Sequence, residues 1–308
     1  MKIIKSTGNE SIAMVYIASN DKGDYIEFVE SVQPPIPREE KWVLIVSTLY
    51  GCPVKCKFCD AGGNYGGKLS TDEILFQIDT PVKKRFPDGK IPVRKFKIQF
   101  ARMGEPAFNE NVLEALRKLP EIYNAPGLMP SVSTIGPAGC EKFFSQLKDI
   151  KNELYKDKFQ MQFSIHSTNV EKRDWLLPVK KMSFSDIANY GDSFFKPGER
   201  KITLNFALAK DSELNPDVLI KYFDPEKFLI KITPVNPTYN AGKNKIETFF
   251  EDKRHDILLE KISEKGYDYI LSIGELEENQ IGSNCGQFVK SHQNAQKKME
   301  HGYRKVSL

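Results

Sequence analysis

The sequence lacks any apolar run long enough to cross a bilayer. A membrane-spanning helix needs about 20 apolar residues, whereas the longest apolar runs here are short, such as Trp42–Val46. The first residues, Met1–Glu10, also lack the apolar stretch of a signal peptide. A strong charge bias is absent too, because the formal net charge is only +4 over 308 residues, which permits a polyanionic partner without requiring one. We therefore expect a cytoplasmic globular protein with no membrane partner and no DNA partner.

Cysteines are few, and their number, five, is odd. Cys140 and Cys285 stand singly, which argues against a disulfide framework. The other three, Cys52, Cys56 and Cys59, lie in one short loop, with three residues between the first two and two between the last two. A structural zinc site usually needs four ligands in two pairs, and the sequence has no second pair. Three thiolates around an iron–sulfur cube would leave one iron open to another ligand, so the spacing favours a [4Fe-4S] cluster over zinc.

Strand and helix patterns alternate along most of the chain. Two β-rich stretches, Ile12–Ile17 and Tyr25–Val32, are joined by a turn at Asn20–Gly23 and predict a hairpin. The strand candidates that follow are Trp42–Thr48, Phe96–Ala101, Ser131–Ile135, Gln160–His166, Ile202–Ala207, Leu229–Pro234 and Tyr267–Ile273. Helical patterns between them are Thr71–Phe86, Asn109–Leu119, Glu141–Leu147, Phe184–Tyr190, Val218–Phe223 and Phe249–Lys265. This alternation predicts an α/β fold of parallel βαβ units that curl into a full or partial barrel, with strands buried on both faces.

Unusual polar residues stand at the ends of several predicted strands. The cysteine loop follows the first strand of the alternating series, and Gly104-Glu105-Pro106 follows the second. Further along, Ser133 closes the third, Ser164 and His166 close the fourth, and Asn236 follows the sixth. Because parallel strands bring their carboxyl ends to one edge, where barrel enzymes hold their active sites, we expect one polar mouth.

The cysteine loop followed by Gly104-Glu105-Pro106 resembles the radical S-adenosylmethionine (SAM) enzymes. The closer resemblance, between Ile12 and Lys298, is to the methyl-cysteine-dependent adenine C-methyltransferases, which modify ribosomal RNA and in some cases transfer RNA. It is carried by Met103–Pro106, Ser133–Gly136, Ser164–Ser167, Asn169–Asp174, Pro234–Pro237 and Asn284–Gln287.

This resemblance implies an architecture and a set of partners. A radical SAM partial (β/α)6 barrel with parallel strands would occupy residues 39–275, after a small N-terminal β-hairpin extension over residues 1–38. A C-terminal segment over residues 276–308 would carry Cys285. The implied cofactors are a [4Fe-4S] cluster and SAM, and the implied partners are a reductant such as flavodoxin or ferredoxin and an RNA or small-molecule substrate.

The resemblance also implies roles for individual residues. The cluster would be held by Cys52, Cys56 and Cys59. The positions that match SAM-binding residues are Gly104, Glu105, Ser133, Ser164 and Asn236. As the catalytic thiolate, Cys285 would accept a methyl group from SAM, while Glu30 would contact the substrate base. His166 is either a polar wall of the pocket or an ordinary histidine with satisfied hydrogen bonds.

Two departures from the family pattern weaken the expectation of a ribosomal RNA substrate. Ile45 stands where the family has a second catalytic cysteine, seven residues before Cys52. The family also has an N-terminal helical domain that grips RNA, and this sequence starts close to the hairpin, so we expect fewer of the phosphate contacts on which RNA affinity depends. Cys140 either approaches the pocket, where it could replace the missing thiol, or starts a helix as an inert residue.

Three functions remain open from the sequence. The first is a radical SAM methyltransferase that uses Cys285 to modify an sp² carbon, an RNA adenine being the family's substrate. The second is a radical SAM enzyme that uses the 5′-deoxyadenosyl radical on a small molecule or peptide. The third is a non-catalytic RNA-binding or regulatory module that has kept the barrel.

Overall fold

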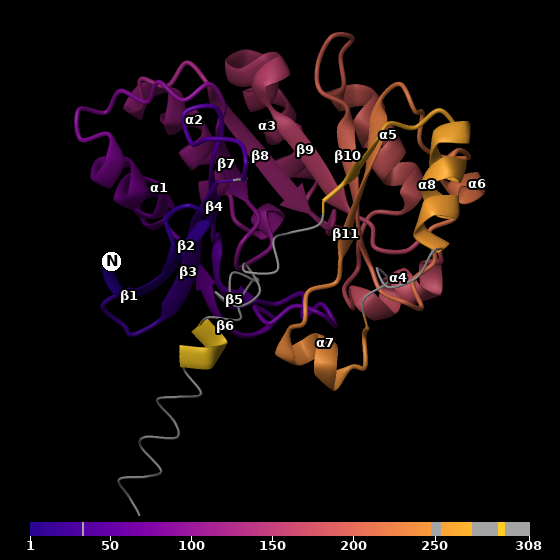
Figure 1. Ribbon diagram of the computed structural model, residues 1–308, viewed down its shortest axis with the longest axis horizontal. Coiled ribbons are helices and arrows are strands. Elements are labelled where there is room, and N and C mark those ends of the chain that lie inside the picture. The colour runs from indigo at the N-terminus through magenta and orange to yellow at the C-terminus, as the bar shows by residue number, and fades with distance from the viewer. Residues whose placement is uncertain (33, 248–253, 273–288, 293–308) are drawn as a thin grey trace, which may run out of the picture.

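A ten-stranded curved sheet organises the molecule in the computed structural model, which describes residues 1–32, 34–247, 254–272 and 289–292 (Figure 1). The strand order is β1-β2-β3-β4-β7-β8-β9-β10-β11-β12. The first three strands are β1 (Lys2–Asn9), β2 (Ala13–Ser19) and β3 (Tyr25–Ser31), and all pairings from β1 to β4 are antiparallel. The predicted hairpin is therefore the β2–β3 pair, and the structure adds β1, an exposed strand whose polar sequence gave no strand signal.

Within this ten-stranded sheet, every neighbouring pair of strands from β4 to β12 is parallel. These strands are β4 (Trp42–Val46), β7 (Phe96–Phe100), β8 (Leu128–Thr134), β9 (Gln160–Ser164), β10 (Ile202–Leu208), β11 (Phe228–Pro234) and β12 (Tyr269–Leu271). The sheet has two ends, β1 and β12, so it is an open, partial barrel. The predicted fold class, a mostly parallel α/β barrel preceded by antiparallel strands, is confirmed.

Helices cover the outer face of this sheet (Figure 1). They are α1 (Thr71–Arg85), α2 (Asn111–Ile122), α3 (Glu141–Ile150), α5 (Phe184–Phe194), α6 (Pro216–Leu219) and α8 (Arg254–Glu264). Two short helices, α4 (Val170–Leu176) and α7 (Tyr239–Lys243), lie instead at the carboxyl edge of the sheet, where they pack in the same apolar cluster as Cys52. Short helical turns are η1 (Pro106–Phe108), η2 (Lys151–Tyr155) and η3 (Lys156–Lys158). At the start of α1, the Ser70 hydroxyl accepts from the Glu73 N–H while the Glu73 carboxylate accepts from the Ser70 N–H. This reciprocal cap satisfies two donors that a helix start otherwise leaves without partners. None of the helices in the described ranges is long and apolar enough to cross a membrane.

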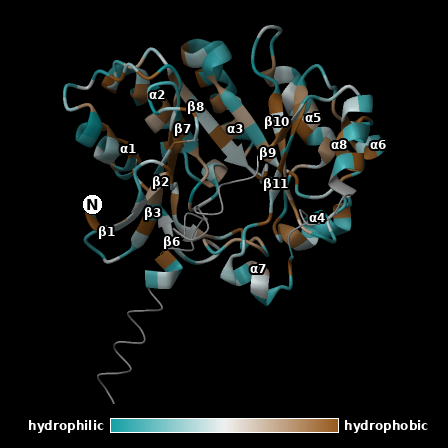
Figure 2. Cartoon of the chain, in the orientation of Figure 1, coloured by the Kyte–Doolittle hydropathy of each residue, from teal (hydrophilic) through white to brown (hydrophobic). Residues whose placement is uncertain are grey.

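The main hydrophobic core lies between the sheet and these helices. Alternate strand residues such as Leu44, Ile98 and Val132 point outward and are fully buried there, because side chains of a strand alternate between its faces. Leu113 and Leu116 of α2 fill the same layer. Figure 2 shows the result as hydrophobic colour on the strands and on the inward sides of the helices.

The inner face of the sheet is polar, which the expectation of strands buried in apolar layers on both faces did not foresee. Gln99 of β7 donates to the Ser133 hydroxyl at 3.5 Å, and Gln162 of β9 donates to the Ser131 hydroxyl at 2.7 Å. Asn205 of β10 in turn donates to the Gln162 side-chain oxygen at 3.1 Å. Amides and hydroxyls thus line the barrel interior, as expected of a surface that faces a polar ligand rather than a packed core.

Replacing Leu116 with alanine should test the core between α2 and the sheet. Because Leu116 is fully buried, we expect Leu116→Ala to lower the free energy of unfolding by about 2–5 kcal/mol. Lys118→Ala, on the exposed side of the same helix, should change it by less than about 0.5 kcal/mol. Urea denaturation followed by circular dichroism measures both, and equal effects would contradict this placement of α2.

Candidate cluster and cofactor site

The three neighbouring cysteines lie in a loop that follows β4 at the carboxyl edge of the sheet. The loop is held at its base by a small antiparallel pair, β5 (Leu49–Cys52) and β6 (Gly63–Lys68). Gly51 has a φ of +70°, and a Cβ there would lie 2.5 Å from the Gly63 carbonyl oxygen. Only glycine fits this close approach without strain. The local sequence therefore turns the chain sharply just before Cys52.

Helix α7, about 180 residues further along the chain, fastens the cysteine loop. The Asp60 carboxylate accepts from the backbone N–H groups of Tyr239 and Asn240, each at 2.9 Å. In return, the Asn240 side chain donates to the Cys59 carbonyl oxygen at 2.7 Å, and the Thr238 hydroxyl donates to that of Phe58 at 2.8 Å. The loop backbone is thus fixed by a distant element. No helix was predicted for this segment, although Thr238, directly after Asn236-Pro237, is a residue type that favours a helix start.

Crowding of the three thiols is the main electrostatic feature of the loop. Burial first, and then the charge of Cys59, raise the pKa of the Cys52 thiol to about 12. Burial, and then Cys59 and Cys52, raise the pKa of Cys56 well above its ordinary value. The thiolate forms therefore repel each other, and a bound cationic centre would favour all of them at once.

The donor set fits an iron–sulfur cluster better than a single metal ion. Within the described ranges, no three His, Cys, Asp or Glu side chains lie close enough together to hold one ion. In a [4Fe-4S] cube each cysteine binds a separate iron, so its ligands need not converge on one point. The three thiols match that requirement, because they interact electrostatically with one another without converging on one point.

The Met103–Pro106 segment, after β7, packs directly against the base of the cysteine loop. The N–H groups of Thr48 and Leu49 both donate to the Met103 carbonyl oxygen, at 2.8 and 3.2 Å. Gly104 has a φ of +102°, and a Cβ there would lie 2.6 Å from the Leu49 side chain. Glycine is therefore needed here for the two loops to lie against each other.

Glu105 links this segment to the end of β8. Its buried carboxylate accepts from the Ile135 N–H at 2.9 Å, from the Ala107 N–H at 3.1 Å, and from the Thr134 hydroxyl. Burial raises the pKa of Glu105 to about 7, although these hydrogen bonds lower it. A carboxylate can accept about four hydrogen bonds, so one position remains for a ligand donor.

The other sequence-predicted cofactor residues lie at the same edge with different exposures. Ser133 is the last residue but one of strand β8, and its hydroxyl accepts from the Gln99 side chain. Ser164 ends β9 half-buried, and Asn236 follows β11 with an exposed side chain. The structure thus brings Glu105, Ser133 and Ser164 to the ends of three neighbouring strands, β7, β8 and β9. Asn236 lies at the end of β11, two strands further along the sheet.

His166 behaves as a histidine with satisfied hydrogen bonds. It adopts a φ of +63°, and its Nδ1 accepts from the Ala207 N–H at 3.0 Å. Burial first, and then the charge of Arg173, lower the pKa of His166 to about 3, so its ring is neutral. The ring packs edge-on against Phe58, beside Cys59, with 4.9 Å between centroids. His166 therefore supports the cysteine loop through its contact with the Phe58 ring.

Comparisons with known proteins agree with this arrangement. A protein of Pseudothermotoga lettingae called a probable dual-specificity RNA methyltransferase RlmN is 28% identical over 242 residues, covering 75% of this chain and 67% of that protein. The dual-specificity RNA methyltransferase RlmN of Wolinella succinogenes is 26% identical over 306 residues, covering 92% of this chain and 83% of that protein. A radical SAM methyltransferase from Sphaerobacter thermophilus has the same fold, with a TM-score of 0.72, 19% identity and coverage of 93% of this chain and 80% of that one. No family model matches the chain.

The chain is similar to the RlmN proteins over most of its length. It covers about two thirds of the length of the Pseudothermotoga relative. The resemblance to the adenine C-methyltransferases, which the sequence analysis based on six segments from Met103–Pro106 to Asn284–Gln287, is thereby confirmed. The roles of the individual residues are tested by none of these comparisons and stay predictions.

Two of the residues that the RlmN resemblance singled out are not among those that the structure brings to the site. Cys285 lies outside the described residues. Glu30, on β3, points to the outer face, where its buried carboxylate pairs with Arg85 of α1 and accepts from the Tyr16 hydroxyl at 3.2 Å. The geometry gives no support to a contact between Glu30 and a substrate base.

Glu27, three residues earlier on β3, points to the inner face and was missed. Side chains alternate along a strand, so Glu27 and Glu30 face opposite ways. The Glu27 carboxylate pairs with Arg102 at 2.6 Å, both being fully buried, and accepts from the Val289 N–H at 2.9 Å. Of these two carboxylates on β3, Glu27 is therefore the one that faces the barrel interior.

Asp60→Ala should loosen the loop that α7 fastens. Because Asp60 accepts two backbone N–H groups and also meets the Lys290 ammonium at 3.1 Å, we expect a loss of about 2–3 kcal/mol in the free energy of unfolding. Less iron should remain bound after anaerobic reconstitution and gel filtration. Asp21→Ala, at an exposed carboxylate, serves as the matched control, and identical iron retention in the two variants would contradict the fastening role.

His166 should make the protein acid-sensitive. The folded pKa of His166, about 3, lies below the ordinary value of 6.5, so the unfolded chain binds the proton more readily and stability falls as pH drops below about 6.5. Asn tolerates positive φ and offers an acceptor oxygen, so His166→Asn keeps the geometry without the titration. Between about pH 7.5 and pH 5, the wild type should lose about 2 kcal/mol more than this variant in urea denaturation. Parallel pH profiles would show that His166 does not titrate as described.

Proposed function

We propose that this chain is a radical SAM methyltransferase that modifies an sp² carbon of an RNA adenine. The observation that carries the proposal is the packing of the three-cysteine loop against Met103–Pro106 at the carboxyl edge of a partial barrel. The names of its RlmN homologues support both the chemistry and an RNA substrate. A cytoplasmic location, where thiolates stay reduced, and a flavodoxin-type or ferredoxin-type reductant are part of the same proposal.

Cys52, Cys56 and Cys59 would hold a [4Fe-4S] cluster, with SAM as the ligand of the open iron. When bound, this pair supplies the electron and the reductive cleavage of SAM from which radical chemistry starts. The protein's own contribution is to place three thiolates in a loop whose backbone is fixed by α7. A loop fixed in this way would keep the three thiolates in place to hold the cluster.

The residues at the neighbouring strand ends would orient SAM. Gly104 lets the segment after β7 approach the cysteine loop without a side chain in between, which leaves backbone groups to face the ligand. Glu105 keeps one acceptor position for the SAM ammonium, a charge that would favour its ionised form. Ser133, Ser164 and Asn236 would bind the remaining polar groups of SAM from β8, β9 and the loop after β11.

Cys285 would act as the methyl acceptor, a thiolate that attacks the methyl of SAM and carries it to the substrate carbon. Two described residues that follow it in sequence dock at the site, which supports this role. Val289 is buried among Cys52, Val54 and Met103 and donates to Glu27, and Lys290 pairs with Asp60. We therefore propose three functional regions: 1–38 as the β-hairpin extension, 39–275 as the barrel, and 276–308 as the segment that brings the acceptor thiol.

Ile45 favours a second candidate function within the same chemistry. Its half-buried side chain packs in a small apolar cluster with Val15 and Val29 on the hairpin strands. No thiol stands at this position to resolve a covalent adduct between protein and substrate. An enzyme that uses the radical on a small molecule or peptide, without methyl transfer, needs no such thiol.

Methyl labelling distinguishes the two candidates. After anaerobic reduction with SAM that carries a labelled methyl, we expect label on the Cys285 peptide in mass spectrometry and formation of S-adenosylhomocysteine. Cys285→Ala should abolish both while leaving the iron content unchanged, and Cys140→Ala should change neither. Production of 5′-deoxyadenosine with an unlabelled Cys285 peptide and no S-adenosylhomocysteine would refute the methyl-carrier role and favour the second candidate.

A further inference from the structure

A cavity opens at the amino edge of the barrel, opposite the cysteine loop. Its volume is about 660 Å³, which is within the range of ligand pockets. The residues that line it precede or begin β4, β7, β8, β9 and β10, so they stand at the amino ends of the parallel strands. Nothing in the proposed methyl transfer uses this mouth.

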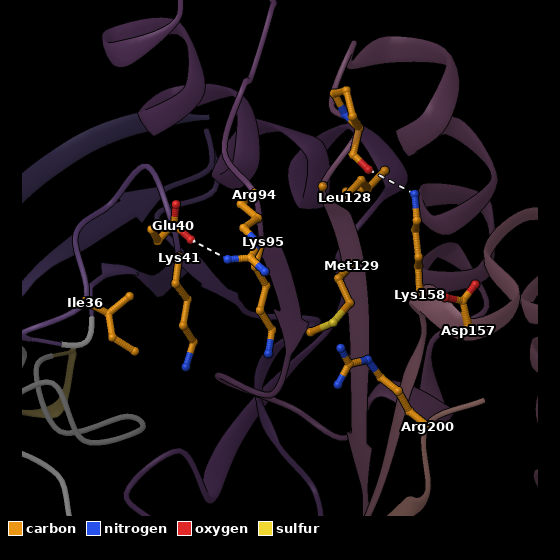
Figure 3. Close-up of a pocket in the computed structure, with 12 residues that line it drawn as sticks. Ile36, Glu40, Lys41, Arg94, Lys95, Leu128, Met129, Asp157, Lys158 and Arg200 are labelled. Atoms are coloured by element: carbon orange, nitrogen blue, oxygen red, sulfur yellow. Dashed lines mark hydrogen bonds and ion pairs between the residues drawn. The ribbon is translucent and has the colours of Figure 1, made fainter. Parts of the chain in front are cut away.

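Positive charge dominates the lining. The basic residues are Lys41, Arg94, Lys95, Lys158 and Arg200, against the carboxylates of Glu40 and Asp157. The Arg94 guanidinium forms an ion pair with the Glu40 carboxylate at 3.0 Å, and the Lys158 ammonium donates to the Pro126 carbonyl oxygen at 3.1 Å. Figure 3 shows Lys41, Lys95 and Arg200 extending from three different elements into the same space.

Two further lysines point into the barrel from its inner face, just beyond this lining. Lys97 lies on β7 and Lys231 on β11, and both side chains are half-buried. Burial first, and then the charges of Lys231, Lys95, Lys41 and Arg200, hold the pKa of Lys97 well below its ordinary value. Burial, followed by Lys41, lowers that of Lys231. Burial, followed by Arg200 and Lys41, lowers that of Lys95. Burial and neighbouring cations thus act together on Lys95 and Lys231.

This group of cationic side chains destabilises the protein when no ligand is bound, because like charges repel and each charged group loses hydration. A ligand with several negative charges would reverse both terms. Phosphate groups suit the set, because Arg200 can bind two phosphate oxygens at once and lysines neutralise the rest. A carboxylate, with a single charge, would leave most of the cluster uncompensated.

The barrel interior beyond the lysines offers a place for a base. Asn205 on β10 has a buried side-chain oxygen without a hydrogen-bond partner among the described residues. An N–H group of a ligand would satisfy it, and such groups are found on the edges of nucleobases. Arg200 and Asn205 are five residues apart, or about 17 Å along an extended strand, and the long Arg200 side chain spans part of that distance.

We propose that the amino-terminal mouth of the barrel binds the phosphate groups of a nucleotide-sized ligand, with Lys95, Lys97, Arg200 and Lys231 as the phosphate contacts. The site is separate from the cysteine loop and does not rest on the proposed methyl transfer. Its ligand is either a free nucleotide or a nucleotide unit of an RNA strand, since both present the same phosphate chemistry.

Calorimetric titration of the full-length protein with pyrophosphate tests the phosphate contacts. The iron–sulfur cluster need not be present in this experiment. A negative result would therefore leave the proposed function standing. We expect saturable binding of one pyrophosphate per chain, weakened at least about 10-fold by Lys97→Gln with Lys231→Gln. The matched pair Lys118→Gln with Lys142→Gln, at exposed lysines on the outer helices α2 and α3, should leave the affinity unchanged.

Thermal unfolding guards against a folding defect in the double variant. Because the variant loses two repelling charges, its Tm without ligand should equal or exceed that of the wild type, and pyrophosphate should raise the Tm of the wild type alone. Arg200→Gln, at the rim, gives a second variant in which binding should weaken. Absence of saturable binding at millimolar pyrophosphate, or equal binding by all variants, would overturn the proposal.

Two further ligands identify the source of the phosphates. ADP should bind more tightly than pyrophosphate if a base enters the barrel, and equal affinities would overturn the nucleotide part of the proposal. A single-stranded RNA hexamer without terminal phosphates serves as competitor. If it displaces ADP at equal phosphate concentration, the site binds an RNA strand; if it does not, the site binds a free nucleotide.

Discussion

Parallel pairing of the strands from β4 to β12 is the constraint on which the rest of the structure depends. Parallel strands require a crossover after each strand, so every connecting loop after a strand emerges at one edge and every return emerges at the other. The cysteine loop, the Gly104–Glu105 segment and the helix α7 that fastens the loop all lie at the carboxyl edge. The lysine-rich cavity lies at the amino edge. One topological rule thus separates two chemically opposite mouths.

The electrostatics of the two mouths differ in sign. At the carboxyl edge, burial and neighbouring anions raise the pKa values of the Cys52 and Cys56 thiols, and burial raises that of the Glu105 carboxyl. At the amino edge, Lys95, Lys97 and Lys231 have lowered pKa values for the mirror-image reason. The first mouth therefore favours a cationic cluster and the sulfonium of SAM, and the second favours a polyanion. The polar inner face, with Gln99 and Gln162, connects the two edges.

Much of the fold and part of the site could be predicted from the sequence. Strands such as Trp42–Val46 and Ile202–Leu208 are marked by apolar, β-branched runs, and the spacing of Cys52, Cys56 and Cys59 is a local signal. The fastening by Asp60 and Asn240 could not be predicted, because it joins residues about 180 positions apart. Glu27 was missed because a motif places a residue in a segment without telling which face of a strand it occupies. The lysine cavity was missed since Lys41, Lys95, Lys97, Arg200 and Lys231 form no cluster in the sequence.

The proposed chemistry depends on three thiolates that bind a four-iron cluster and leave one of its irons open. Mössbauer spectroscopy of protein reconstituted under argon with ⁵⁷Fe and sulfide tests it, with SAM added in a second sample. We predict about four iron atoms per chain in a [4Fe-4S] signature, with one iron site of the cluster changing its spectrum when SAM binds. A colourless protein without bound iron, or a cluster whose iron sites are all indifferent to SAM, would contradict the account.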